Sequence, residues 1–433
     1  MRKSVWSDSK KMPGFKRLDK DIKTDVLIIG GGLCGILCGW FMEKYGVDYV
    51  VVEGNKIGFG ITKNTTAKIT SQHGLIYSKI ISQYGKEFAQ MYLKANQDAV
   101  EEYERLCQSI SCDFEKKDAY TYSLSDQDII EKEVKAVNGL GFNAQFFEKL
   151  ELPFKTKGAV RFQNQAQFNP FKFLAEISKG LNIYEDTFIR ELVPGGAITD
   201  NGKIFAEKII VATHFPFINK HGSYFMKLYQ HRSYVSAYEN AVDLNGMYVD
   251  EDIKGMSFRN YGNLLLVGGG GHRTGKQGEG WKKINLFAKR NYPNADLKFE
   301  WATQDCMSLD GIPYIGQYSK NTPNMFVATG FNKWGMTSSM VSAMILSDMV
   351  REKKNSLCEV FSPSRNMLKP KLLVNAFEAV GNLITPTTKR CPHLGCALKW
   401  NKAEHSWDCP CHGSRFEENG KLIENPSTKD AKL

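Results

Sequence analysis

DVLIIGGGLCG, residues 25–35, and the segment that leads from it to Glu53 decide the fold. The apolar run of residues 25–29 is short enough for a strand that is buried on both faces. Gly30, Gly32 and Gly35 follow at the spacing G-x-G-x-x-G and open a predicted helix. A second apolar run then ends in Glu53, which completes a unit of strand, turn, helix, strand and acid.

This unit is typical of a site that binds a dinucleotide. One glycine makes the tight turn, one lets a pyrophosphate approach the backbone at the positive helix N-terminus, and one lets helix and strand pack closely. Glu53 is predicted to accept a hydrogen bond from a ribose hydroxyl. An ordinary glycine-rich turn is the alternative interpretation. A membrane helix over residues 26–42 is disfavoured by the three consecutive glycines near its start.

The composition is compatible with a large enzyme and excludes few classes of protein. The 433 residues are 42% hydrophobic, enough for two or three domains with substantial cores. The net charge of +10 comes from scattered basic clusters, which favours solvated surface charge over a nucleic-acid site and leaves an acidic protein partner open. The N-terminal residues lack the apolar core of a secretory signal, and we expect a cytoplasmic protein without a membrane span.

Later segments add further cofactor contacts. Residues 58–68 form a loop of small and hydroxyl residues, in which Thr65, Thr66 and Lys68 are predicted to lie against the cofactor; a plain surface loop is the alternative. Apolar residues recur at helical spacing over 78–109 and predict one long helix. A buried strand ends at Thr213. A last glycine turn opens a helix near residue 338, and its predicted cofactor contacts are Gly330, Gly335, Met336 and Thr337.

The order of these segments, with DGIPYIG at residues 310–316, resembles the flavin-dependent oxidoreductases of the D-amino-acid oxidase, glycine oxidase and sarcosine oxidase superfamily. The resemblance covers about residues 21–350. It implies an α/β fold class, with a Rossmann-like FAD-binding domain and an antiparallel-sheet substrate domain. It also implies FAD as cofactor and oxidation of a carbon–nitrogen or carbon–oxygen bond by hydride transfer to the flavin.

Four residues near the C-terminus form a second motif. Cys391 and His393, then Cys409 and His412, give C-x-H, fifteen residues and C-x-x-H. Two thiolates and two imidazoles in paired loops are the ligands of a Rieske [2Fe–2S] cluster. Zinc is the alternative metal, but zinc fingers do not ordinarily place cysteine and histidine two residues apart.

The flanks of this motif resemble a small all-β Rieske domain. In the Rieske proteins of cytochrome bc-type complexes, the positions of Cys396 and Cys411 form a disulfide, so the resemblance implies one here. The resemblance also implies that Ser414 donates a hydrogen bond to a cluster sulfur. The domain looks shortened, because a helical linker over residues 371–382 reaches Cys391 within nine residues. The usual base of the domain is either missing or supplied by the flavin domain.

These patterns predict the following organisation. Residues 1–20 are an N-terminal arm, and residues 21–350 are the oxidoreductase. Its FAD-binding segments are about 21–110, 160–225 and 303–350, and its substrate domain is about 111–159 and 226–302. Residues 351–385 form a linker, and residues 386–433 form the Rieske domain.

Candidate catalytic residues follow from the resemblance. His73 and His272 match histidines that face the flavin and the substrate in sarcosine oxidases, and His272 is a candidate base or carboxylate partner. Lys333 is expected near the pyrimidine edge of the flavin. Arg259 is a weaker candidate on a substrate-domain strand. For His73, a structural histidine that caps the next helix is the alternative.

The two cofactors together predict a function. We expect a dehydrogenase that passes a hydride from a small amine, amino acid or similar substrate to FAD, with electrons leaving singly through the cluster to a one-electron acceptor, for which an acidic redox protein is a candidate. A protein-to-protein redox relay or sensor without its own small-molecule substrate is the alternative. A Rieske oxygenase is disfavoured because the sequence shows no two-histidine, one-carboxylate iron motif.

Overall fold

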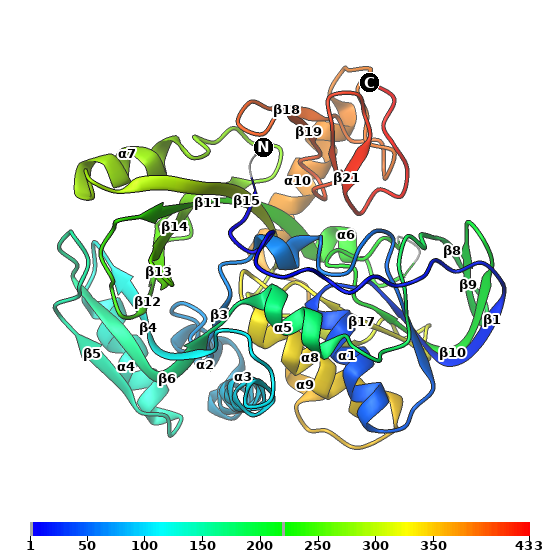
Figure 1. Ribbon diagram of the computed structural model, residues 1–433, viewed down its shortest axis with the longest axis horizontal. Coiled ribbons are helices and arrows are strands. Elements are labelled where there is room, and N and C mark those ends of the chain that lie inside the picture. The colour runs from blue at the N-terminus through cyan, green and yellow to red at the C-terminus, as the bar shows by residue number, and fades with distance from the viewer. Residues whose placement is uncertain (1–2, 219–220) are drawn as a thin grey trace.

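The computed structural model describes residues 3–218 and 221–433. Within them the strands form three sheets, which occupy different parts of the molecule in Figure 1. A mostly parallel sheet lies at the lower right, a mostly antiparallel sheet at the left, and a small sheet at the top near the C-terminus. This arrangement confirms the predicted α/β class with an antiparallel substrate domain and a small all-β module.

The first sheet is built around the glycine-rich unit. β1 (Ile22–Ile29) lies between β2 (Tyr49–Val52) and β10 (Lys203–Val211), and all three are parallel. Alternate β1 side chains enter two different cores, so β1 is buried on both faces as predicted. The sheet also contains β7 (Ile183–Tyr184), β8 (Ile189–Val193), β9 (Gly196–Thr199), β16 (Tyr314–Gln317) and β17 (Met325–Thr329). α1 (Leu33–Lys44) and α8 (Gly335–Val350) pack together in the larger core.

The second sheet forms the predicted substrate side. Its strands are β15 (Asp296–Ser308), β11 (Leu228–Glu239), β14 (Leu264–Arg273), β13 (Ser257–Tyr261), β12 (Met247–Asp250), β4 (Glu115–Ser123), β6 (Gly158–Gln167) and β3 (Lys68–Ile69), with β5 (Ala144–Phe147) paired to β6. α4 (Asp128–Gly139) and α7 (Lys282–Asn291) pack against this sheet. Because β6 and β15 run on to residues 167 and 308, the sheet extends past the predicted limits at 159 and 302.

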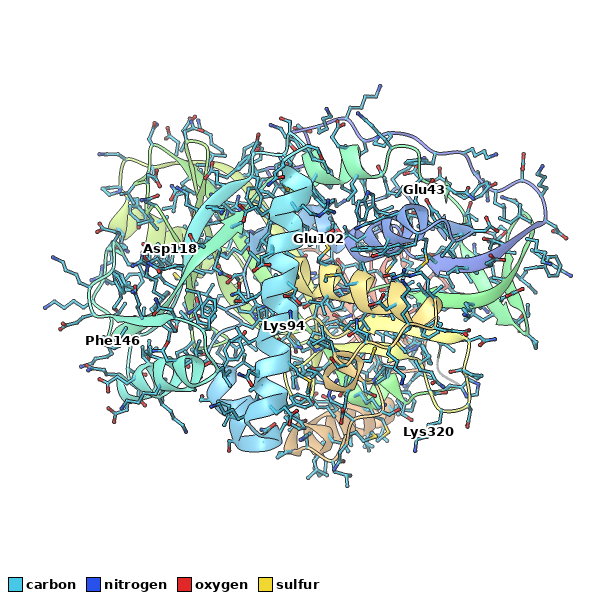
Figure 2. All side chains as sticks on the ribbon, turned by 90° about the horizontal axis from the view of Figure 1, so that it is seen from below. Glu43, Lys94, Glu102, Asp118, Phe146 and Lys320 are labelled. Atoms are coloured by element: carbon cyan, nitrogen blue, oxygen red, sulfur yellow. A yellow bond between two sulfur atoms is a disulfide. The ribbon has the colours of Figure 1, made fainter. Side chains whose placement is uncertain are left out.

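The helix predicted over residues 78–109 is two helices. α2 (Tyr77–Tyr84) ends where Gly85 adopts a φ of +89°, and α3 (Lys86–Cys107) begins directly after it. The prediction was wrong because apolar spacing continues across the break, while the backbone turns at the glycine. Figure 2 shows α3, with Lys94 and Glu102 along it, lying between the substrate side around Asp118 and the FAD side around Glu43.

The C-terminal part is a four-stranded antiparallel sheet preceded by a helix. The strands are β18 (Lys399–Asn401), β19 (Ser406–Asp408), β20 (Arg415–Phe416) and β21 (Leu422–Glu424). The segment predicted as a linker contains α9 (Cys358–Phe361) and α10 (Pro370–Ile384), and α10 contacts α6 (Tyr224–Lys227). Figure 1 shows α10 beside this small sheet.

The N-terminal arm is anchored in the interior. Trp6 is fully buried, and its indole N–H donates to the Thr65 carbonyl oxygen at 2.8 Å. A short 3-10 helix over Ile61–Asn64 precedes this loop, and α5 (Pro170–Ile177) packs beside it. The arm therefore supports the loop that holds Thr65, Thr66 and Lys68.

Candidate active site and metal centre

The glycine-rich turn between β1 and α1 is tightly packed on two sides. Gly30 has a φ of +112°, and a side chain there would meet the Ala212 carbonyl oxygen at 2.6 Å. A Cβ at residue 35 would lie 1.9 Å from the Gly30 carbonyl oxygen, so only glycine lets α1 begin here. At Gly32 the nearest atom would be 3.5 Å away, and this backbone lines the cavity described next.

A cavity of about 1340 Å³ runs along the turn and is lined by residues of both large sheets. A pocket for one small ligand usually has roughly 300–1,000 Å³, so this cavity has room for an extended dinucleotide and a second molecule. The predicted cofactor contacts that line it are Gly30, Gly32, Glu53, Thr65, Thr66, Lys68, Thr213, Gly335 and Met336. Gly35, Gly330 and Thr337 are not part of its wall.

Glu53 stands at the end of β2 with its carboxylate fixed. One oxygen accepts from the Gly31 N–H at 2.7 Å, and the other accepts from the Asn55 N–H at 2.9 Å. Burial raises the pKa of Glu53, and these two N–H groups oppose the rise. The side chain lines the cavity, where it can accept a further hydrogen bond from a ribose hydroxyl.

Lys68 places a cation in the same wall. Its Nζ donates to the Thr66 hydroxyl at 3.2 Å. Burial lowers the pKa of Lys68 to about 7, and the positive charge of Arg259 adds to this effect. A negatively charged cofactor group bound here would offset both effects and favour the charged amine.

His73 lines the cavity with both ring nitrogens engaged. Its Nε2 lies 2.9 Å from the Thr70 carbonyl oxygen, which only accepts, so Nε2 carries the proton. Nδ1 therefore accepts from the Tyr92 hydroxyl at 2.6 Å, and the ring stacks on Trp334. Burial lowers the pKa of His73 to about 3. The ring is thus a fixed neutral imidazole and is poorly suited to proton transfer.

Lys333 and Asp305 both line the cavity and attract each other electrostatically. Burial lowers the pKa of Lys333, and Asp305 opposes this shift. Burial raises the pKa of Asp305 to about 6, although Lys333 and Arg232 act to lower it. Two opposite charges in one cavity wall can bind the ammonium and carboxylate ends of an amino acid.

His272 and Arg259 lie outside the cavity wall. His272 contacts the hydroxyl of Tyr234, which lines the cavity, through Nε2 at 3.0 Å, and its Nδ1 lies 2.9 Å from the Arg273 carbonyl oxygen. Arg259 is fully buried and donates to the Ala67 carbonyl oxygen at 2.8 Å. The structure therefore brings His73 and Lys333 to the cavity. His272 lies behind Tyr234 of the cavity wall, and Arg259 is buried against Ala67, outside that wall.

The four predicted metal ligands come together in two loops. Each loop is closed by a backbone hydrogen bond, from the Cys391 N–H to the Cys396 oxygen and from the Cys409 N–H to the Ser414 oxygen. The sulfur of Cys409 lowers the pKa of Cys391 to about 7 through a hydrogen bond, which places the two sulfurs side by side. Cys396 and Cys411 form the disulfide that the resemblance implied.

The two histidine rings of these loops lie edge to face, with 5.0 Å between ring centroids and an interplanar angle of 86°. In the described part of the chain, Nδ1 of His412 is buried without a hydrogen-bond partner. A buried imidazole nitrogen in this state fits a metal ligand. Nε2 of His412 points the other way, toward the Phe225 carbonyl oxygen at 3.1 Å.

A buried network of charges joins the small sheet to β11. Arg232 of β11 pairs with Glu404 and, at 3.5 Å, with Glu424. Arg415 pairs with the same two carboxylates at 2.8 and 3.2 Å and with Asp408 at 3.0 Å. The substrate-side sheet of the oxidoreductase thus supplies a base on which the shortened module rests.

Gln304 links the cavity directly to a metal-binding loop. Its side chain lines the cavity, and its amide N–H donates to the Gly413 carbonyl oxygen at 2.8 Å. Its amide oxygen accepts from the Thr274 hydroxyl at 2.9 Å. Gly413 directly follows His412, so one side chain separates the cavity from the predicted cluster ligands.

Comparison with known families decides the class of protein. The family described as FAD dependent oxidoreductase matches residues 25–349, and the Rieske [2Fe-2S] domain matches residues 365–432. The chain belongs to the FAD-dependent oxidoreductase family. It also carries a C-terminal Rieske domain, and its cofactors are FAD and a [2Fe–2S] cluster.

Individual relatives agree with this assignment of the oxidoreductase. The chain is 34% identical to the "Putative Rieske 2Fe-2S iron-sulfur protein YhfW" of Bacillus subtilis strain 168, over 99% of this chain and 97% of that protein. Two solved structures share the fold. Glycine oxidase from Geobacillus kaustophilus has a TM-score of 0.66 at 19% identity and covers 79% of this chain and 99% of its own. L-proline dehydrogenase from P. horikoshii has a TM-score of 0.67 at 16% identity and covers 80% and 98%.

The residues of this oxidoreductase fit both cofactors. Gly32 leaves the backbone open where a pyrophosphate would lie, and Glu53 stands where the ribose would lie. Cys391 and Cys409 offer two adjacent sulfurs, and His412 offers an unpartnered nitrogen. In the described part of the chain, none of the helices has the length and apolar character needed to cross a bilayer.

Several functional residues escaped the sequence analysis. Gln304 and Asp305 lie just beyond the predicted end of the substrate domain at residue 302, and a polar pair within an otherwise strand-like stretch was the available signal. Trp334 lies within the glycine turn near residue 335 that was singled out, but its stacking on His73 depends on tertiary contact. Nothing in the local sequence marked Arg232 as the anchor of the Rieske module.

Proposed function

We propose that this oxidoreductase is a dehydrogenase that oxidises a small amine, amino acid or similar substrate by hydride transfer to FAD, with electrons leaving singly through the Rieske cluster. The bound cofactors supply a two-electron acceptor and a one-electron carrier. The observation that carries the proposal is the hydrogen bond from Gln304, in the cavity wall, to Gly413 beside His412. This contact supports direct exchange of electrons within one chain.

The cavity supports an enzyme over a redox relay or sensor. A relay needs only access to the cofactor, whereas this cavity has volume beyond that of one ligand and paired charges in its wall. We propose that Asp305 binds the substrate ammonium group, and that Lys333 binds its carboxylate or the adjoining edge of the cofactor. His73 orients this wall as a neutral ring, and His272 positions Tyr234 from behind.

The acceptor is proposed to be a one-electron carrier, and the net charge of +10 favours an acidic one.

We also propose that the chain is divided into FAD-binding, substrate, linker and Rieske segments. Contacts between the parts support a single working unit, because the Rieske module rests on Arg232 of the substrate-side sheet.

Asp305 predicts a pH dependence. Burial raises its pKa to about 6, so the carboxyl is neutral below that pH and charged above it. With an amine substrate, we expect kcat/KM to rise as the pH increases through about 6, because only the charged form pairs with ammonium. Asp305→Asn is expected to remove this rise and raise KM roughly tenfold or more. A pH profile of kcat/KM for both proteins checks this, and an unchanged profile in the variant would contradict it.

Gln304 predicts an effect on electron transfer alone. In Gln304→Leu, the buried Gly413 oxygen loses its donor, and a buried acceptor left unpaired costs about 1–3 kcal/mol. We expect flavin reduction by substrate to keep its rate and cluster reduction to slow about tenfold. Gln317→Leu is the matched control, because its amide donates to the Ser319 oxygen beyond the outer strand β16. Stopped-flow absorbance at flavin and cluster wavelengths separates the two steps.

The proposed reaction is tested by anaerobic titration of the purified holoprotein with amines, amino acids and N-methyl amino acids. Visible spectra follow the flavin, and electron paramagnetic resonance follows the cluster. Bleaching by one compound, together with a reduced Rieske signal, is the expected result. Two intact cofactors that no compound reduces, while a protein donor reduces them, would instead favour the relay.

A further inference from the structure

α10 has an unusual orientation. Its polar residues face inward: Asn375 donates to the Met226 oxygen at 3.0 Å and accepts from Arg273 at 2.9 Å, while Asn382 is also buried. Its large apolar side chains face outward, and together with Leu368 they form the apolar stripe: Leu368, Leu373, Val374, Phe377, Val380, Leu383 and Ile384. A surface helix normally turns its apolar face to the core. This one does the opposite.

The apolar stripe is strongly exposed. Leu373, Phe377, Val380 and Ile384 recur at helical spacing on one face. Phe377 is 76% exposed, Ile384 74% and Leu368 77%. Isolated exposed apolar residues need no explanation, but a continuous row of them marks an interaction surface.

The charges around the stripe indicate its partner. Lys369 and Lys371 stand at the start of α10 and lie close enough to Lys79 to affect its pKa. Lys389 follows the end of the helix. The sole acidic residue in 368–390 is Glu378, and it is paired with Lys276. The rim is therefore cationic, which suits a negatively charged surface.

Composition favours lipid over a protein partner. The stripe consists of leucine, valine, isoleucine and one phenylalanine, whereas protein interfaces concentrate their binding energy in tryptophan, tyrosine and arginine. An apolar face flanked by lysines is the pattern of a helix that lies in the plane of a bilayer surface. With 15 residues, α10 is suited to lie on a bilayer.

The stripe is joined to a cluster loop. Arg390 donates to the Leu383 and Thr385 oxygens at the end of α10 and to the Gly395 oxygen in the first ligand loop. Leu394, next to His393, is exposed in that loop. The Ala397 N–H also donates to the Asn382 oxygen at 2.9 Å, so the first loop contacts the C-terminal end of α10.

We propose that the apolar stripe of α10 docks this protein on an anionic lipid bilayer, with the helix lying in the membrane surface and the first cluster loop beside it. Binding then combines insertion of the stripe with attraction of lysines to lipid headgroups. The seven apolar residues of the stripe do not line the substrate cavity, whereas Lys371 at the start of α10 does. The proposal does not depend on the proposed reaction.

Vesicle sedimentation of the full-length holoprotein tests the proposal. We expect binding to vesicles of phosphatidylcholine and phosphatidylglycerol, weaker binding to phosphatidylcholine alone, and a decrease as salt rises. Leu373→Ser and Phe377→Ser should each bind roughly tenfold more weakly, since each removes one inserted side chain. The matched control is Leu286→Ser on α7, where the leucine is 59% exposed against 63% for Leu373. The control should bind as the wild type does.

Flavin absorbance and the Rieske resonance signal report whether each variant keeps its fold and cofactors. Absence of binding to anionic vesicles would overturn the proposal, as would equal binding by Leu373→Ser and the wild type. A dimer that forms without lipid and is lost in Leu373→Ser, with no vesicle binding, would assign the stripe to a second copy of the chain instead.

Discussion

Arg232→Ala is expected to detach the Rieske module from the flavin domain while FAD stays bound. The side chain is almost completely buried and neutralises Glu404 and Glu424 from β11. Without it, Arg415 alone faces those two carboxylates and Asp408. Removal of one partner from a buried ion pair costs about 3–5 kcal/mol. Limited proteolysis between the parts and the loss of flavin-to-cluster electron transfer measure the effect.

Acid should reproduce part of this effect in the unmodified protein. Burial acts to raise the pKa of Glu404, but Arg232 and Arg415 outweigh burial and lower it to about 2. A lowered carboxyl pKa stabilises the docked state at pH values above the ordinary carboxyl pKa near 4.5, and this contribution is lost as the pH falls toward 2.

Lys94→Ala is the control for Arg232→Ala, because the exposed pair of Lys94 with Asp98 contributes only about 0.3–0.5 kcal/mol. If Arg232→Ala behaved like this control, the charge network would not hold the module.

Gly35→Ala should abolish folding of the FAD-binding domain. The new methyl group would lie 1.9 Å from the Gly30 carbonyl oxygen, which is backbone and cannot move without shifting α1 from the turn. Gly32→Ala is the matched variant in the same motif, because its methyl group would meet no atom closer than 3.5 Å. We expect Gly32→Ala to fold, with FAD affinity reduced roughly tenfold or more, because the methyl group occupies the backbone face proposed for the pyrophosphate.

Circular dichroism and FAD fluorescence separate the two outcomes. Gly35→Ala should give insoluble or unfolded protein, and Gly32→Ala should give folded protein that releases FAD on dilution. Normal FAD content in both variants would contradict the proposed position of the pyrophosphate.

Local chemistry explains which features the sequence predicted. The turn and Glu53 are adjacent elements of one short unit, and the four predicted metal ligands have a characteristic spacing: Cys391, His393, Cys409 and His412. Each pattern can therefore be recognised from the sequence alone. The break at Gly85 was missed because one glycine interrupts an otherwise helical apolar spacing. Its backbone angle depends on packing rather than on the pattern.

Features that depend on distant contacts could not be predicted. Arg232 and Glu404 are 172 residues apart, and Gln304 and Gly413 are 109 residues apart. The outward face of α10 has the same amphipathic spacing as an inward one, so only its contacts through Asn375 reveal the direction. Likewise, the sequence identifies His73 as a candidate catalytic residue, but it cannot show that Thr70 and Tyr92 form hydrogen bonds with both ring nitrogens.

The central claim is that electrons pass between flavin and cluster within one chain, across the contact of Gln304 with Gly413. The most direct test is photochemical reduction of the flavin without oxygen, followed by timed freezing and electron paramagnetic resonance of the cluster. We predict a reduced Rieske signal that grows at a first-order rate independent of protein concentration. A rate proportional to protein concentration, or a cluster that stays oxidised beside a reduced flavin, would contradict it.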